Sequence, residues 1–390
     1  MSSPLERLGL HFNPFEPSAS GAPVTPELWL PNSWGGKLRE MLDMLGTGRG
    51  VKAVAIAGEY GGGKTYILQW LFRHEFPSRR IKPFYFDNPG IQFYDLANSL
   101  LRQIGRKDFA KFLWELSDFH VGGFQRSLFV KGFEEYLQGQ RAGRARPEVL
   151  PALQAAILRA GVTKDDEIAH RLARIIAETP VKPFFEYRDF IAGGRNTLVA
   201  EREEAPYFSA ILKTLQLGAG IKAVAFLIDE FEEVALQKRL TRREAHDYLA
   251  TLKRLINLTT NQELWLVVGM TPAAVEITRQ LEPALWERFT GEGRYSLQIP
   301  PLTALDAIEI VRRRLEAARP EGSDLPSRLY PFPEGFESVL SPAVISSPRR
   351  LIKVCFYAIS EADSTTLPFS KDYLISIESK AYPAPEQEEQ

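Results

Sequence analysis

The sequence contains few of the residues that carry metal or redox chemistry. Its 390 residues include one cysteine and five histidines, and the histidines are scattered without the spacing of metal ligands. An internal disulfide is therefore excluded, and a zinc site built from cysteine and histidine is not expected. Cys355 lies in the apolar run 351–356, which predicts a buried core thiol rather than a nucleophile.

The sequence also lacks long apolar runs and a strong net charge. No apolar run approaches the roughly 20 residues that a membrane helix needs, and residues 1–7 lack the apolar core of a signal peptide. We therefore expect a cytoplasmic protein with no membrane partner. The formal net charge is −1, so any contact with nucleic acid must come from local patches rather than from an overall field.

A glycine-rich stretch at residues 58–65 matches the phosphate-binding pattern G-x-x-x-x-G-K-[ST] at every fixed position. It follows an apolar run at 51–57 that is typical of a buried strand, and it precedes residues 66–72, whose apolar positions share one helical face. Glycines let backbone N–H groups turn around a phosphate chain, and the helix N-terminus adds partial positive charge. A glycine-rich turn before an ordinary helix is the alternative, and the match of both flanks disfavours it.

This pattern predicts a nucleotide site with defined roles. Lys64 is expected to pair with the β- and γ-phosphates, and the Thr65 hydroxyl is expected to ligate Mg²⁺. The predicted nucleotide-binding residues are Gly58, Glu59, Tyr60, Gly61, Gly62, Gly63, Lys64, Thr65 and Tyr66.

A second motif follows another apolar run. Residues 221–228 are typical of a buried strand and end in Asp229 and Glu230. A carboxylate at the C-terminal end of a parallel strand can hold Mg²⁺ directly or through water, which we expect of Asp229. Glu230 suits a general base that activates the water attacking the γ-phosphorus. The alternative is a solvated acidic turn, which would be favoured without the glycine loop.

Strands and helices alternate along much of the chain. Further strands are expected at 84–88, 264–269 and 296–299, with helices around 37–45 and 245–258. This alternation predicts an α/β fold with a parallel sheet, whose ligands bind beyond the carboxyl ends of the strands. The interval from Lys64 to Asp229 is far longer than one crossover requires, so it must hold a mostly helical insertion.

The expected domain organisation has five segments. Thr303 and Asp306 resemble a capping box, and the helical pattern of a C-terminal lid starts there. The segments are 1–90, the N-terminal segment and first part of the core; 91–205, the helical insertion; 206–301, the second part of the core; 302–381, the lid; and 382–390, a disordered tail.

Taken together, these motifs make the chain resemble the AAA+ P-loop ATPases, and within them the Orc-like group and its relatives in bacterial and archaeal mobile elements and defence loci. Residues 58–65 and 226–230 look particularly like the P-loop ATPases of BREX-type phage-defence systems. The resemblance spans about residues 10–380, although the insertion matches only as helical. It implies ATP as the nucleotide, Mg²⁺ as the metal, a homo-oligomer, and DNA or a partner protein docked on the insertion.

The resemblance also suggests roles for later residues. The segment 268–272 is similar to sensor 1, which makes Thr271 the residue that positions the attacking water, although many relatives have Asn there. The segment 285–289 looks like the one that supplies the arginine finger, here Arg288. As a structural alternative, Arg288 would flank a buried pair formed by Trp286 and Phe289.

Two further roles come from the same resemblance. The segment 346–351 resembles the Gly-Asn-x-Arg motif of sensor 2, with Ser at both positions before the proline. Arg349 then contacts the γ-phosphate and Arg350 is the reserve, whereas the structural alternative has Arg349 cap a helix or pair with a glutamate. Asn88 is a candidate switch residue that restrains Glu230.

Two basic loops, 141–146 and 238–243, are candidates for contact with phosphate backbones or are solvated charged loops. After the lid the sequence leaves no room for the winged helix of Orc-like proteins, so sequence-specific DNA recognition is not expected of this chain alone.

Three functions remain in view. The first is an ATPase that hydrolyses ATP to drive oligomer assembly or remodelling on DNA or a DNA-associated partner, in phage defence or a mobile element. The second is a nucleotide-gated scaffold with slow or no turnover. The third, a small-molecule kinase, is disfavoured by the positions of Arg288 and Arg349.

Overall fold

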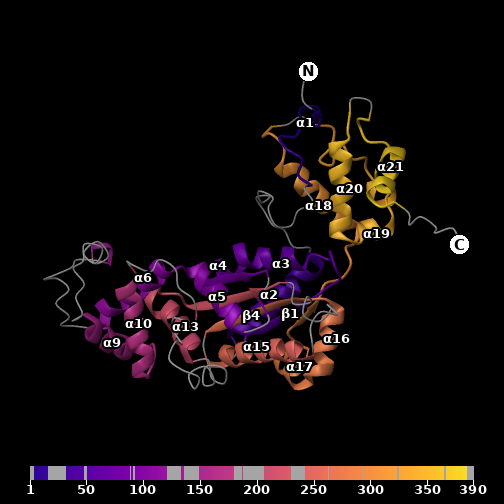
Figure 1. Cartoon of the computed structure of the whole chain (residues 1–390). Helices are drawn as coiled ribbons and strands as arrows, with labels where there is room; N and C mark the ends of the chain where they lie inside the picture. The colour runs from indigo at the N-terminus through magenta and orange to yellow at the C-terminus, as the bar shows by residue number, and fades with distance from the viewer. Residues whose placement is uncertain are drawn as a thin grey trace. The chain divides into compact units, whose positions relative to one another are not determined.

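The computed structural model describes the chain in ranges separated by gaps. The described residues are 4–15, 32–47, 51–87, 89–90, 93–120, 133–135, 149–179, 187, 206–229, 242–261, 263–291, 293–322, 325–363 and 366–383. The chain forms two compact units (Figure 1). Unit 1 comprises Met1–Glu40, Ala57–Trp70 and Gln298–Gln390, and unit 2 comprises Met41–Ile56 and Leu71–Leu297. Across the described ranges, no helix is long and apolar enough to cross a membrane.

A five-stranded parallel sheet confirms the expected α/β fold class. Its strands are β1 (Ala53–Ala57), β2 (Ile81–Phe86), β3 (Ala223–Ile228), β4 (Leu264–Met270) and β5 (Ser296–Gln298), in the order β2-β3-β4-β1-β5. β3 pairs in parallel with both β2 and β4. Between β1 and β5, the Ala55 N–H donates to the Tyr295 carbonyl and the Ile299 N–H to the Ala57 carbonyl, as in a parallel pair.

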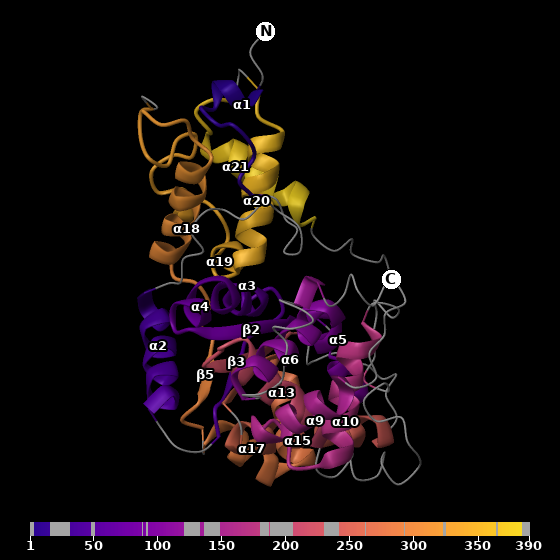
Figure 2. The same ribbon diagram turned by 90° about the vertical axis from the view of Figure 1, so that its left-hand side faces the viewer.

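Aromatic packing covers one face of the sheet. The central strands β1, β3 and β4 are wholly buried, because helices cover both faces of a parallel sheet. The ring of Phe226 in β3 contacts the rings of Phe86, at 5.2 Å between centroids, and of Phe208 in α13 (Pro206–Gly218), at 6.0 Å. In Figures 1 and 2, α4 (Phe76–Ser78) lies on one side of the sheet, and α15 (Arg242–Asn261) and α17 (Pro283–Thr290) lie on the other.

The second strand lies earlier in the chain than the expected 84–88. It begins at Ile81 and ends at Phe86, with Pro83 inside it, opposite Ala225 of β3. A proline is tolerated here because β2 is the edge strand, where a residue can lack an outward-facing N–H without breaking the ladder.

The helix expected at 66–72 begins earlier and changes character within that range. It is α3 (Lys64–Trp70), followed by the π-helical segment η1 (Leu71–Glu75) and then by α4. Single π-turns within helices are often found at functional sites.

The described residues between 93 and 179 are mainly helices and turns. They form α5 (Phe93–Ile104), α6 (Arg106–His120), α9 (Val149–Arg159) and α10 (Asp166–Glu178). α9 and α10 pack against each other and against α6. Two further helices of the chain are α2 (Asn32–Thr47) and α16 (Pro272–Leu281).

Most of unit 1 is helical and covers the segment 302–381 predicted to be a lid, a name kept here for these helices. It contains α18 (Ala304–Ala317), the short 3-10 helix η2 (Phe336–Ser338), α19 (Pro342–Ile345), α20 (Pro348–Ser360) and α21 (Lys371–Ala381). Thr303 and Asp306 form the expected capping box at the start of α18. Cys355 is buried in the lid core, as expected.

The N-terminal segment of the chain belongs to the lid core. Residues 4–15, which include α1 (Pro4–Arg7), bury Leu8, Leu10 and Phe15 among the lid helices. The Asn13 side chain donates to the Phe356 carbonyl at 3.2 Å and to the Ser360 hydroxyl at 2.9 Å. The lid is thus built from both ends of the sequence.

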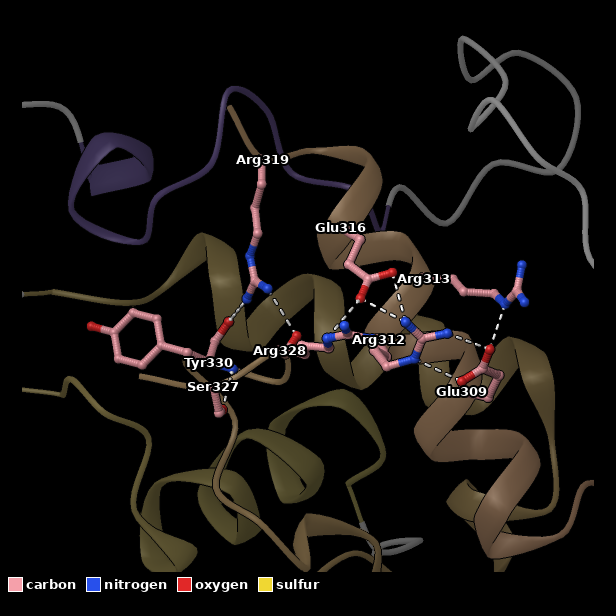
Figure 3. Close-up of polar contacts among 8 residues, drawn as sticks. All are labelled: Glu309, Arg312, Arg313, Glu316, Arg319, Ser327, Arg328 and Tyr330. Carbon is pink, nitrogen blue, oxygen red and sulfur yellow. Dashed lines mark hydrogen bonds and ion pairs between the residues drawn. The ribbon is translucent and has the colours of Figure 1, made fainter. Parts of the chain in front are cut away.

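Charged side chains brace the exposed part of α18 (Figure 3). Arg312 pairs with Glu309 at 2.5 Å and with Glu316 at 2.6 Å, and Arg313 also pairs with Glu309. Arg319 donates to the carbonyls of Arg328 and Tyr330, which ties the loop after α18 to the end of that helix.

Candidate functional site

The glycine loop has a backbone conformation that requires glycine at three positions. Gly61 and Gly63 have φ angles of 75° and 99°, in the left-handed region that side chains disfavour. A Cβ atom on Gly62 would lie 2.9 Å from the Glu59 carbonyl oxygen, which the Gly62 N–H contacts. The loop therefore turns too tightly for side chains at these positions.

Lys64 points back into this loop. Its side chain is buried, with 6% of its surface exposed. The ammonium group donates to the carbonyls of Gly58 at 3.1 Å and Glu59 at 3.3 Å. A charged donor makes stronger hydrogen bonds to anionic oxygens than to neutral carbonyls, so this arrangement suits a phosphate ligand. Thr65 and Tyr66 follow in the first turn of α3.

The first turn of the lid helix α20 lies against the loop, within unit 1. The Arg349 guanidinium lies 4.8 Å from the centre of the Tyr60 ring. A Cβ atom on Gly61 would lie 3.1 Å from the Arg349 Cβ, so glycine also permits this approach. Arg350 instead lies 5.4 Å from the ring of Tyr382. Of the two candidate arginines, Arg349 is therefore the one beside the loop.

In unit 2, Asp229 directly follows β3 and is buried, with 3% of its surface exposed. Its carboxylate Oδ2 accepts a 2.7 Å hydrogen bond from the hydroxyl of Tyr85 in β2. Its backbone N–H donates to the Phe86 carbonyl at 2.9 Å. A buried carboxylate offers the oxygen ligands that Mg²⁺ prefers. Glu230 and Asn88 lie outside the described residues.

Thr271 directly follows β4 and caps the next helix. Its hydroxyl oxygen accepts a hydrogen bond from the Ala274 N–H at 3.2 Å, and Pro272 is the first residue of α16. Threonine is favoured at a helix N-cap and proline at the first helical position, so Thr271 and Pro272 predict this helix start from the sequence. The hydroxyl proton is still able to donate, so capping and positioning of a water are compatible.

Arg288 is exposed on α17, whose buried residues Leu285 and Phe289 fix the helix on the core. The rings of Trp286 and Phe289 are 6.1 Å apart, but only Phe289 is buried and Trp286 is half-buried, so the pair is not the wholly buried one expected there. Within the described ranges, no hydrogen bond or ion pair joins Arg288 to another residue. Its guanidinium is thus presented to solvent by a firmly anchored helix.

The strand order shows which strands precede the predicted site residues. β3, β4 and β1 are neighbours, and their carboxyl ends lead into Asp229, Thr271 and the glycine loop. After β1, the next strand in the sequence, β2, lies at one edge of the sheet. After β4, the next strand, β5, lies at the opposite edge.

Most of the two predicted basic loops lies outside the described residues. Loop 141–146 is not described, and of loop 238–243 only Arg242 and Arg243 are, as the first residues of α15.

A scan against models of protein families found no match. A search of curated proteins also found no match. Among solved structures, the chain is similar to the ORC2 protein of Aeropyrum pernix, determined as ADPNP–ADP complexes, with 16% sequence identity and a TM-score of 0.48 over 94% of this chain and 71% of that one.

Proposed function

We propose that this chain is an ATPase of the AAA+ class that binds ATP with Mg²⁺ at the loop Gly58–Thr65. The geometry of that loop carries the proposal. Gly61 and Gly63 have positive φ angles that other residues rarely adopt, and the buried Lys64 ammonium donates to the loop's own carbonyls. Such a loop, placed between a strand and a helix N-terminus, supplies N–H donors, dipole and charge to a phosphate chain.

In this proposal, individual residues have distinct roles in phosphoryl transfer. Lys64 neutralises charge on the β- and γ-phosphates, and Arg349 reaches the γ-phosphate from the lid. Thr65 and Asp229 would hold Mg²⁺, which neutralises charge that develops on the phosphate oxygens when it is bound. Glu230, directly after Asp229, is proposed as the base that activates the attacking water.

We also propose that the active form is a homo-oligomer in which Arg288 acts on the nucleotide of a neighbouring copy. The exposure of Arg288 on an anchored helix supports this role. An arginine supplied by another subunit stabilises charge that appears on the γ-phosphate in the transition state.

The target of the ATPase is proposed from the sequence resemblance alone. It is DNA or a DNA-associated partner protein in the cytoplasm, docked on the helical insertion, in phage defence or a mobile element. The basic loops 141–146 and 238–243 are the proposed backbone contacts.

A nucleotide-gated scaffold with slow turnover is the second candidate, and the capping role of Thr271 favours it. The Thr271 hydroxyl already accepts a hydrogen bond from the Ala274 N–H. It is therefore less suited to positioning the attacking water than the amide of an asparagine, which has separate donor and acceptor atoms. Phosphate release therefore has to be measured together with binding.

The experiment measures phosphate release against protein concentration for the wild type, Arg288→Ala and Glu230→Gln, with and without DNA. Each variant should bind ATP and lose at least roughly tenfold in turnover, as expected when a base or a charge-stabilising group is lost. Mixing the two variants should restore partial activity, because some interfaces then pair an intact Glu230 with an intact Arg288.

Arg279→Ala is the matched control, since Arg279 is also exposed, on the preceding helix, where it pairs with Glu276. It should keep wild-type turnover. Wild-type turnover in Arg288→Ala, or no recovery in mixed oligomers, would contradict the role across the interface. If the wild type bound ATP but released no phosphate, the nucleotide-gated scaffold would be the supported function.

A further inference from the structure

The phenol of Tyr85 connects the neighbouring strands β2 and β3 beside Asp229. Tyr85 lies in β2, opposite Leu227 of β3, so its side chain is diagonal to Asp229, two residues further along β3. The two rings that flank Tyr85 in sequence, Phe84 and Phe86, contact Phe226 on one face of the sheet. Because side chains alternate along a strand, Tyr85 points to the opposite face.

On that opposite face, two contacts hold the Tyr85 side chain. Its hydroxyl donates to Asp229 Oδ2 at 2.7 Å. Its ring meets the ring of Phe72 edge to face, with centroids 6.1 Å apart and an interplanar angle of 69°. Its backbone carbonyl accepts from the Gln103 side chain at 2.8 Å. Few rotamers of the phenol satisfy both side-chain contacts, so the hydroxyl has a defined position.

The Phe72 contact has its own significance. Phe72 lies in the π-helical segment η1, which directly continues the helix that begins with Lys64 and Thr65. Tyr85 therefore contacts both the acidic residue and the chain segment that follows the phosphate-loop helix.

We propose that Tyr85 is a positioning residue for Asp229: its hydroxyl fixes the orientation in which this carboxylate meets the magnesium ion of a bound nucleotide. A buried carboxylate without a fixed donor samples more rotamers and binds a cation that demands strict octahedral geometry less well. Outer hydrogen bonds of this kind orient metal ligands in many sites. This inference rests on the proposed ATP site.

Tyr85→Phe tests the inference, since it removes only the hydroxyl and keeps the ring against Phe72. The measurement is the affinity of the full chain for a fluorescent ADP analogue, first in EDTA and then across a Mg²⁺ titration. The EDTA affinity should equal that of the wild type, because the phosphate loop is unchanged. The Mg²⁺ concentration that half-saturates the gain in affinity should rise about tenfold, as expected for loss of a hydrogen bond to a charged group.

Tyr373→Phe is the matched control. The Tyr373 hydroxyl donates to the Ala358 carbonyl at 2.8 Å within the lid, so its loss should lower the melting temperature and leave the Mg²⁺ titration unchanged. In the background of Asp229→Asn, adding Tyr85→Phe should produce no further change, because Tyr85 acts through that carboxylate.

Two results would overturn the positioning role. One is a wild-type Mg²⁺ titration in Tyr85→Phe, and the other is an equal loss of affinity in EDTA, which would make Tyr85 a general structural residue. If the wild type itself bound nucleotide neither in EDTA nor with Mg²⁺, the proposed function would fail, and this inference with it.

Discussion

The guanidinium of Arg349 stacks 4.8 Å above the ring of Tyr60, so a lid arginine rests on the glycine loop through a cation–π contact. Tyr60 is 77% exposed, which makes it an unusually accessible aromatic residue in the described part of the chain. The loop thus contributes a side chain as well as its backbone. We propose that this side chain keeps Arg349 next to the γ-phosphate of a bound nucleotide.

Tyr60→Ala should reduce the preference of the chain for ATP over ADP by about threefold. An exposed cation–π contact contributes about 0.5–1 kcal/mol, and its loss lets Arg349 move away from the loop. Tyr60→Phe should behave as the wild type because the ring remains. Equilibrium binding of both nucleotides measures this preference.

Tyr382→Ala is the control for that experiment, since the Tyr382 ring holds Arg350 and Lys353 rather than Arg349. It should leave the preference for ATP unchanged. An equal effect of both alanine variants would mean that Tyr60 has no special role.

Phe15→Ala should destabilise the lid by about 3–5 kcal/mol, the usual cost of removing a fully buried aromatic side chain. Phe15 packs edge to face on Phe332, with ring centroids 6.0 Å apart. Burial raises the pKa of the Cys355 thiol in the same core, so a thiol reagent should react slowly with the native chain. The rate of that reaction reports lid opening and should rise strongly in Phe15→Ala.

Phe12→Ala provides the comparison, because Phe12 lies in the same segment but is 41% exposed. It should leave the reactivity of Cys355 near the wild-type rate. Equal rates for Phe15→Ala and the wild type would mean that the N-terminal segment contributes little to the lid.

The sequence predicted the parts of the fold that depend on local pattern. Continuous apolar runs indicated the buried strands, and glycine spacing indicated the loop at 58–65, because both reflect requirements of the residues themselves. β2 was placed too late because Pro83 argues against a strand unless the strand is known to lie at an edge. Whether β2 lies at an edge depends on the order of all the strands in the sheet.

Contacts between distant residues could not be predicted in the same way. The hydrogen bond from Tyr85 to Asp229 spans 144 positions and depends on the register of β2 against β3. The docking of Asn13 on α20 spans 343 positions. The sequence did not indicate that Leu8, Leu10 and Phe15 are buried among helices near the other end of the chain.

Glu309→Gln should make the lid slightly less stable at neutral pH and less sensitive to acid. Hydrogen bonds from Arg312 and Arg313 lower the pKa of the Glu309 carboxyl from 4.5 to about 2. The ionised form is therefore favoured by folding, and its contribution is present above pH 4.5 and lost as the pH falls toward 2. Partly exposed pairs contribute up to about 1 kcal/mol. Chemical denaturation from pH 7 to 2 should show this contribution in the wild type and its absence in the variant; parallel curves would contradict the assignment.

The central claim is that the loop Gly58–Thr65 binds nucleotide, and equilibrium binding of a fluorescent ATP analogue to the wild type and Lys64→Ala tests it most directly. Lys64→Ala should lose binding, because the phosphate charge loses its main cationic partner, while keeping the wild-type melting temperature without nucleotide. Lys37→Ala, which changes an exposed lysine of α2, should bind as the wild type does. Equal affinity of Lys64→Ala and the wild type, or no binding by the wild type at millimolar ATP and Mg²⁺, would contradict the account.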